Sequence, residues 1–283
     1  MSGIPPVIGS RDPWHGGEVL PGVECVLAPN ASPMTLDGTN TWLVTSSDRA
    51  IVVDPGPDDS SHLAAITAGL SEREIRPEVV LLTHGHADHS AGADRFARSW
   101  GVPVRALDPR HRLGDEGLVE DDVVVIGDAE LHVIETPGHS SDSLSFYSPA
   151  DQAIMTGDTV LGRGTSVIAW PDGSLSDYLD SLEKLRRLAE DVELNLVLPG
   201  HGPALPEPGK LLIDYLLHRE ERLNQVRAAV ADGAASVAEI VDIVYQPLSS
   251  ELVPAALAST AAQWEHLAKL GEVSKREVIV RDD

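Results

Sequence analysis

Cysteine is nearly absent from the sequence, which has 283 residues and the single cysteine Cys25. One cysteine cannot form an internal disulfide bond. The N-terminal segment, MSGIPPVIGSRDPW, also lacks an apolar run of the kind that a secretion signal requires. These absences favour a cytoplasmic protein.

Long apolar runs are absent as well. No stretch approaches the roughly 18 consecutive apolar residues that usually span a bilayer, so we expect no membrane partner. The longest apolar runs, such as Val123–Ile126, have the length of buried strands. A hydrophobic content of 42% is nevertheless enough to fill a sizeable core in a chain of this length, which indicates a globular protein.

Basic residues are scarce relative to acidic ones. The chain has 21 lysines and arginines against 45 aspartates and glutamates, a formal charge of −24. Such a charge repels polyanions at long range and argues against extended nucleic-acid contacts. We therefore expect a small or neutral substrate and no DNA partner.

Up to residue 206, short β-rich runs alternate with helical segments. The helical pattern covers residues 60–72, 89–100 and 175–190, and in the last of these leucines at spacings of three and four form one apolar face. Predicted strands cover residues 41–46, 50–54, 78–83, 102–107, 122–127, 130–136, 143–148, 152–157 and 194–199. Because strands occur both in pairs and around helices, the pattern predicts a mixed α/β architecture with sheets covered by helices.

The β signals nearly vanish after residue 206. Helices are predicted over residues 210–232, 236–245 and 252–270, followed by the strand-like EVSKREVIV. We therefore divide the chain into a domain at 1–206 and a small helical, winged-helix-like domain at 207–283. The second region holds 8 basic and 13 acidic residues, which makes it a poor DNA reader. Packing, or shaping the mouth of a site, is the favoured role.

The segment THGHADHS, residues 83–90, places three histidines and an aspartate within six positions: His84, His86, Asp88 and His89. Three imidazoles buried without a metal would be polar groups in need of partners. The segment therefore predicts one metal site or two, with further ligands elsewhere in the chain.

Three more candidates lie where a β-run gives way to a glycine-containing turn: His139, Asp158 and His201. Taken singly, each is as readily an ordinary turn residue. Seven ligands exceed the usual four of a tetrahedral zinc ion but suit two ions that share one carboxylate and a bridging solvent molecule. Imidazole and carboxylate ligands without cysteine favour Zn²⁺ and leave Mn²⁺ or Fe open.

These residues fall in four motifs that resemble the metallo-β-lactamase-fold hydrolases. The motifs are T-H-x-H-x-D-H at 83–89, T-P-G-H at 136–139, G-D at 157–158 and P-G-H-G at 199–202. The resemblance implies an αββα sandwich, in which two mixed sheets lie face to face, helices lie outside and the metals lie at one edge. Ala91 departs from the family, which often has glycine there, but alanine is small enough for the start of a helix.

The resemblance also implies roles for individual residues. The first metal would be held by His84, His86 and His139, the second by Asp88, His89 and His201, and Asp158 would bridge them. Asp54, in VVDPG, is similar to the family's acid that supports the histidine loop. Its alternative role is that of a turn-forming residue before Pro55.

Two longer stretches resemble the β-lactamase-like protein 2 subfamily, in which a small helical domain follows PGHG. They are GDTVLGRGTSVIAWPDGSLSDYLDSLEKL and YLLHRE. Some members of that subfamily cut single-stranded RNA, whereas many relatives hydrolyse thioesters or lactones. The subfamily places His218 near the cleft, and Tyr178 and Arg163 are further candidates for substrate contact.

These features predict a dinuclear-metal hydrolase that attacks a small ester-like bond with a metal-bridging hydroxide, while Asp88 or Asp158 orients the hydroxide or carries its proton. The alternative is an endoribonuclease that cleaves single-stranded RNA. A flavodiiron-like redox protein and a metal-binding regulator without catalysis are further hypotheses. The natural substrate and the oligomeric state stay open.

Overall fold

The computed structural model describes residues 8–10 and 12–274, whose strands form two six-stranded sheets. The first sheet has the order β1 (Gly17–Leu20), β2 (Val23–Leu27), β3 (Asn40–Ser46), β4 (Arg49–Val53), β5 (Arg76–Leu81) and β6 (Val104–Arg105). The second has the order β12 (Leu205–Pro206), β11 (Leu196–Pro199), β10 (Ala153–Gly157), β9 (Leu144–Ser148), β8 (Ala129–Glu135) and β7 (Val123–Ile126). Both sheets are mixed, since β4, β5 and β6 pair in parallel in the first and β10 and β11 do so in the second.

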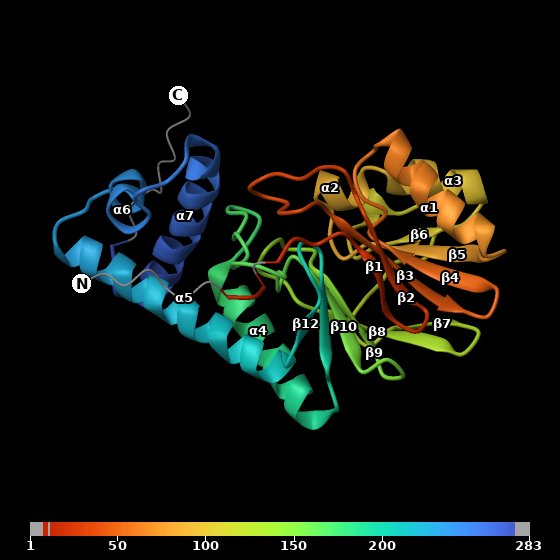
Figure 1. Ribbon diagram of the computed structural model, residues 1–283. Coiled ribbons are helices and arrows are strands. Elements are labelled where there is room, and N and C mark those ends of the chain that lie inside the picture. The colour runs from red at the N-terminus through yellow and green to blue at the C-terminus, as the bar shows by residue number, and fades with distance from the viewer. Residues whose placement is uncertain (1–7, 11, 275–283) are drawn as a thin grey trace.

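Seven α-helices accompany the sheets in the described part of the chain, with 3₁₀ turns at Pro109–His111 and Ser250–Leu252. They are α1 (Ser60–Glu72), α2 (Ala87–Ser90), α3 (Ala93–Trp100), α4 (Leu175–Asp191), α5 (Pro208–Ala231), α6 (Val237–Val244) and α7 (Val253–Lys269). In Figure 1, α1 and α3 lie outside the first sheet, whereas α6 and α7 lie together at the opposite end of the molecule, and the long α5 runs from there back to α4. None of the helices in residues 8–10 and 12–274 combines the length and apolar character needed to cross a bilayer.

Alternation along the strands of the first sheet produces the layers. On β4, Ala50 and Val52 pack with α1 and α3, while Ile51 and Val53 pack between the two sheets. Successive side chains of a strand point to opposite faces, so a strand covered on both faces appears as a continuous apolar run. This is why AIVVD predicts a strand without a polar face, and the predicted αββα sandwich of two mixed sheets is confirmed.

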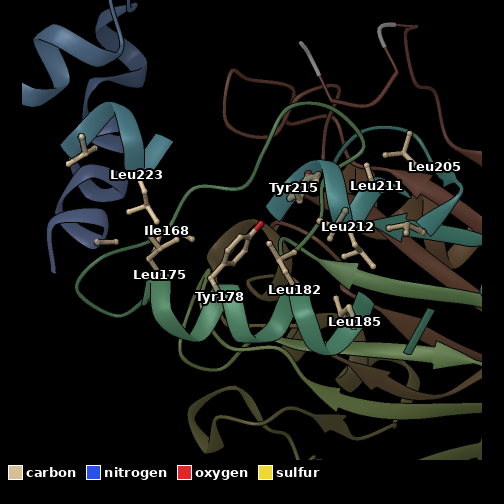
Figure 2. Close-up of a cluster of buried hydrophobic side chains, with 14 of the residues drawn as sticks. Ile168, Leu175, Tyr178, Leu182, Leu185, Leu205, Leu211, Leu212, Tyr215 and Leu223 are labelled. Atoms are coloured by element: carbon tan, nitrogen blue, oxygen red, sulfur yellow. The ribbon is translucent and has the colours of Figure 1, made fainter. Parts of the chain in front are cut away.

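The outer face of the second sheet is covered by α4 and α5. Figure 2 shows Tyr178 and Leu182 of α4 directed toward Leu212 and Tyr215 of α5. The same apolar cluster continues along α5 to Leu223 and into α7. The C-terminal helices that the sequence predicts are therefore present, and they share a core with the sandwich.

Several details differ from the predicted elements. The expected helix over residues 89–100 divides into α2 and α3, because Gly92 at the break donates its N–H to Gly56 O and Gly56 donates to His89 O. β1, β2 and β12 are missing from the predicted strands, since they are short and β1 and β2 carry the charged residues Glu18 and Glu24. The C-terminal strand-like segment falls mainly on residues 275–283, outside the described residues. The winged-helix likeness and the boundary at residues 206 and 207 stay predictions.

Candidate metal centre

The seven predicted ligands lie just beyond the ends of four strands. The 83–89 segment follows β5, and its last part forms the short helix α2, which carries Asp88 and His89. His139 follows β8, Asp158 follows β10 and His201 follows β11. Loops at strand ends can present side chains while the sheets hold their positions, so all seven meet at one edge of the sandwich.

Three of the histidines form one group. The Nδ1 atom of His86 lies 3.0 Å from His84 Nε2 and 2.9 Å from His139 Nε2. His84 and His139 are buried and His86 is half-buried. The three ring nitrogens therefore point at one another from two separate loops, within the spacing that a single ion could bridge.

A second group joins Asp88, His89 and His201. His201 Nε2 lies 3.2 Å from Asp88 Oδ2 and 3.3 Å from His89 Nε2, and His89 Nε2 lies 3.5 Å from Asp88 Oδ2. Both imidazoles are fully buried, whereas the Asp88 side chain is 30% exposed. Asp88 is thus the member of this group that reaches solvent.

Asp158 lies between the two groups. Its Oδ1 is 3.4 Å from His89 Nε2, and its Oδ2 is 3.4 Å from His201 Nε2 and 3.7 Å from His139 Nε2. One carboxylate therefore contacts histidines of both groups, which is the position that a shared ligand requires.

The hydrogen bonds of the outer ring nitrogens show what the inner ones can do. His139 Nδ1 lies 2.6 Å from Val167 O, and His201 Nδ1 lies 3.1 Å from Gly38 O. A carbonyl oxygen only accepts, so each Nδ1 must carry a proton, and Nε2 is the nitrogen that a metal ion can bind in place of a second proton. His84 Nδ1 also carries a proton, because it lies 3.0 Å from Thr83 Oγ1. The Thr83 hydroxyl already donates its proton to Asp54 and can only accept one from His84.

In the first group, His84 Nε2 and His139 Nε2 both lie about 3 Å from His86 Nδ1, and one proton on that atom can serve only one of them, whereas a cation can bind all three nitrogens. Asp158 Oδ1 is also buried and finds no hydrogen-bond partner among the described residues. The seven residues therefore fit divalent cations, whereas a simple polar core would leave these atoms unsatisfied.

Charges in the centre lead to the same conclusion. Burial alone would raise the pKa of Asp158, but the His201 and His89 imidazoles hold it well below its usual range. Burial would lower the pKa of His201, yet Asp158 and then Asp88 raise it to about 9. The cluster thus draws in positive charge, which is the electrostatic condition for a cation site.

Asp54 holds the 83–89 segment in place through hydrogen bonds. Its carboxylate accepts hydrogen bonds from Thr83 N at 2.8 Å and Thr83 Oγ1 at 2.6 Å, and its Oδ2 lies 2.9 Å from His89 Nδ1. The residue is buried and has a left-handed backbone (φ 51°). One acid therefore orients His89 directly and His84 through Thr83, beyond what a turn-forming aspartate would do.

Asn40 holds the P-G-H-G loop and is missing from the predicted site. Its Nδ2 donates to Pro199 O at 2.9 Å and Gly202 O at 2.8 Å, and its backbone N–H donates to Gly200 O. A buried asparagine needs partners for its amide, so an asparagine at the start of a buried strand is a signal that could have been used. The carbonyls of Gly38 and Val167, in contrast, leave no mark in the sequence.

The three candidates for substrate contact have different surroundings. Arg163 donates to the carbonyls of Ser10 and Asp12 and forms an ion pair with Asp37 at 3.1 Å. Tyr178 is fully buried and its hydroxyl donates to Thr159 O at 2.6 Å. His218 lines a cavity against the C-terminal helices. Their role toward a substrate stays a prediction.

Comparison with known proteins agrees with this geometry. Residues 34–201 match the Metallo-beta-lactamase superfamily, so the chain belongs to that superfamily and the predicted resemblance is confirmed. A crystal structure of a Beta-lactamase domain protein from Burkholderia ambifaria superposes with a TM-score of 0.77 at 26% identity, covering 90% of this chain and 88% of that one.

Three relatives make the likeness more specific. The lactamase-like protein aptB of Emericella nidulans is 35% identical over 212 residues, or 75% of this chain and 66% of that protein. The Beta-lactamase-like protein 2 homolog of Caenorhabditis elegans is 31% identical over 212 residues, or 71% and 68%. An atrochrysone carboxyl ACP thioesterase of Aspergillus fumigatus is 27% identical over 248 residues, or 82% and 76%. The chain thus spans about two thirds of the length of the first two relatives.

Proposed function

We propose that the protein is a dinuclear-metal hydrolase that cleaves an ester-like bond in a small molecule, with thioesters as the leading substrate class. The observation that carries the proposal is the convergence of five imidazoles and two carboxylates at one edge of the sandwich. The name of the thioesterase relative supports the choice of thioesters. Zn²⁺ is the proposed metal, because the ligands are imidazole and carboxylate.

In this proposal each group of ligands would hold one ion, and Asp158 would be available to both. His84, His86 and His139 would hold the first ion, and Asp88, His89 and His201 would hold the second. Bound ions of this kind lower the pKa of coordinated water toward about 7 and polarise the bond under attack. The fold supports this chemistry because hydrogen bonds hold the Nδ1 atoms of His84, His139 and His201 and leave their Nε2 atoms directed inward.

The two carboxylates then have separate tasks. Asp158, 12% exposed and of depressed pKa, stays anionic and balances positive charge. Burial would also raise the pKa of Asp88, but His89 and His201 lower it to about 2, so the two carboxylates differ in exposure: Asp88 is 30% exposed and its Oδ2 lies 3.2 Å from His201. We propose that Asp88 orients the attacking water and passes its proton outward.

A panel of substrates tests this function. Zinc-loaded protein is assayed against a thioester, a lactone, an activated phosphodiester and single-stranded RNA, with metal content measured on the same samples. We expect thioester turnover at two zinc ions per chain, and no turnover by His86→Ala, which also reports contaminating enzymes. Bound zinc with no hydrolysis of any member would contradict the proposal. Cleavage of RNA alone would favour the endoribonuclease alternative, which the charge of −24 opposes.

A further inference from the structure

A cavity of about 180 Å³ lies between the loop at residues 165–167 and the C-terminal helices. Three of its lining side chains are basic: His218, Arg219 and Arg222, all on α5. The twelve residues that line it, all within the described part of the chain, include no aspartate or glutamate. In a chain with 45 acidic and 21 basic residues, this basic cavity is a local reversal of charge.

Arg219 is the most buried of the three basic residues, with 3% of its surface exposed. Its Nη2 donates to Ser166 O, and its guanidinium lies 4.6 Å from the centre of the Tyr178 ring. Its Nε atom is buried and has no hydrogen-bond partner in residues 8–10 and 12–274. A buried guanidinium that meets only neutral groups is costly, because nothing offsets the loss of its hydration.

Arg222 also meets only neutral groups. Its Nη1 donates to Gln225 Oε1 at 2.8 Å and contacts Val244 O at 3.4 Å, and its guanidinium lies 4.7 Å from the Tyr245 ring. Neither Arg219 nor Arg222 has a carboxylate within 4 Å among the described residues. Arg227, further along α5, shows the contrast, since it pairs with Glu220 at 2.8 Å and Glu272 at 2.6 Å.

His218 completes the set. Its Nδ1 atom is buried and is also without a hydrogen-bond partner in the part of the chain that the structure describes. Burial, followed by the charges of Arg219 and Arg222, lowers its pKa to about 4. The imidazole is therefore neutral at pH 7 and supplies one N–H donor without adding charge.

We propose that the basic cavity binds a phosphate group through Arg219, Arg222 and His218. Two guanidiniums without a counter-carboxylate match a doubly charged phosphoryl group better than a singly charged carboxylate, and guanidinium forks suit its oxygens. The ring faces of Tyr178 and Tyr245 hold the two arginines in place by cation–π contact.

The cavity adjoins the metal centre through one loop. Ser166 and Val167 line the cavity, and the same two residues lie 3.1 Å (Ser166 Oγ) and 2.6 Å (Val167 O) from His139 Nδ1. If the proposed thioester hydrolysis holds, the substrate would carry its phosphate at a distance from the bond that is cleaved. A phosphopantetheine thioester has this chemistry.

Direct binding tests the site without relying on catalysis. The full chain, zinc-loaded and in phosphate-free buffer, is titrated calorimetrically with 4′-phosphopantetheine and with pantetheine. We expect the phosphorylated compound to bind at least about tenfold more tightly, and Arg222→Gln to remove that advantage, since a charge-assisted hydrogen bond to the phosphate is lost. Arg227→Gln, which removes the same charge from the same helix, should bind both compounds as the unaltered protein does.

Titration with inorganic phosphate shows whether the cavity binds the free phosphate ion or a phosphate group that is part of a larger substrate. Phosphate bound only by the metals would bind equally to the unaltered protein and to Arg222→Gln, and that result would overturn the proposal. Equal affinity for pantetheine and phosphopantetheine would also overturn the proposal. So would bound phosphate that an RNA oligonucleotide displaces and phosphopantetheine does not.

Measurements of thioester hydrolysis then test the phosphate site and the proposed function separately. Acyl-phosphopantetheine should have a lower KM than acyl-pantetheine, and Arg222→Gln should bring the ratio of the two KM values toward one. If neither thioester is hydrolysed, the proposed function fails while the calorimetric result on phosphate still stands. If both are hydrolysed with the same KM, the proposed function stands and the substrate role of the cavity fails.

Discussion

The metal centre and the basic cavity lie on two sides of one short loop and have opposite charges. On one side of Ser166 and Val167, His139 joins six further side chains that include two carboxylates and attract cations. On the other side, the two arginines of the cavity meet only neutral groups. The fold thus keeps a cation site and an anion site close together without letting the arginines neutralise the carboxylates, which is the arrangement needed to activate water and hold an anionic substrate at once.

The two regions are also held in place by different forces. Ligands of the metal centre follow strand ends, and hydrogen bonds from buried groups such as Asp54 and Asn40 fix their loops. The basic cavity lies between helices that are held by apolar packing around Leu223 and Leu267. Changes in the first region should therefore act on metal binding and activity, whereas changes in the second should act on stability or on substrate affinity.

The largest effect is expected from Asp158→Ala. This change removes the only carboxylate that contacts histidines of both groups in the described part of the chain. We expect thioester kcat/KM to fall by about 10²–10³-fold, the scale of losing one preorganised electrostatic group, and zinc content to drop below two ions per chain. Both are measured on the same preparation.

Asp128→Ala is the matched control for that change, because Asp128 is an exposed aspartate on the turn between β7 and β8. It should keep full zinc content and turnover. An Asp158→Ala protein that still bound two zinc ions and hydrolysed thioesters at the original rate would show that Asp158 is not a shared ligand.

The next largest effect is expected from Leu267→Ala, in the packing that supports the basic cavity. Leu267 is fully buried in the cluster that joins α7 to the sandwich. Loss of a buried leucine costs about 2–5 kcal/mol, so the free energy of unfolding should fall by that amount in urea titrations followed by circular dichroism. Leu270→Ala, at an exposed leucine, should change it by less than about 0.5 kcal/mol.

The shape of the same unfolding curve sharpens the comparison of the two regions. Because one apolar cluster extends from the second sheet into α7, we expect a single transition for the unaltered protein and for Leu267→Ala. A separate early transition in Leu267→Ala, with zinc still bound afterwards, would mean that the C-terminal helices unfold independently of the sandwich.

The metal centre could be predicted from the sequence much further than the cavity could. Its side chains occur in short sequence motifs, and each motif follows a predicted strand that ends in a recognisable turn. His84, Asp158 and His201 could therefore be identified as candidates from the sequence. The groups that orient them are partly backbone carbonyls, such as Gly38 O and Val167 O, which any residue type would supply. These contacts follow from the fold alone.

The basic cavity had almost no sequence signal. Arg219 and Arg222 are three positions apart on a long helix, a spacing typical of any solvated helix face. Their difference from Arg227 depends on Glu220 and Glu272, which pair with Arg227, and on the neutral residues from other parts of the chain that line the cavity. Only His218 was named beforehand, through the resemblance to the subfamily.

Asp54→Ala should have a smaller effect than Asp158→Ala, because Asp54 acts on the metal through other residues. Removing a partner that orients a metal-binding histidine typically costs 10–100-fold in affinity or activity, and we expect zinc affinity to fall within that range. A competition titration with a chelator measures it. Asp59→Ala, which removes the cap of α1, should lower the free energy of unfolding and leave zinc affinity unchanged. Equal zinc affinity in the two variants would assign Asp54 to turn formation alone.

The smallest effect is expected from His218→Gln, a change in the basic cavity, on the free energy of unfolding at low pH. The pKa of His218 is lowered to about 4 in the folded chain by burial and by Arg219 and Arg222, whereas an unfolded histidine has a pKa of about 6.5. Between these values the unfolded chain binds a proton that the folded chain does not, so the free energy of unfolding falls as the pH drops from 7 toward 4. His218→Gln cannot take up this proton and should lose less stability, by up to about 1 kcal/mol once partial solvent exposure is considered.

Urea titrations at pH 7.0 and 5.0 measure this difference, with His15→Gln, at an exposed histidine, as the control that should match the unaltered protein. A bound phosphate would favour the protonated imidazole and so raise the pKa of His218. Addition of phosphate should therefore shrink the difference between the unaltered protein and His218→Gln at pH 5.0. If phosphate leaves that difference unchanged, His218 does not face the anion, and the contrast between a cation site and an anion site depends on the two arginines alone.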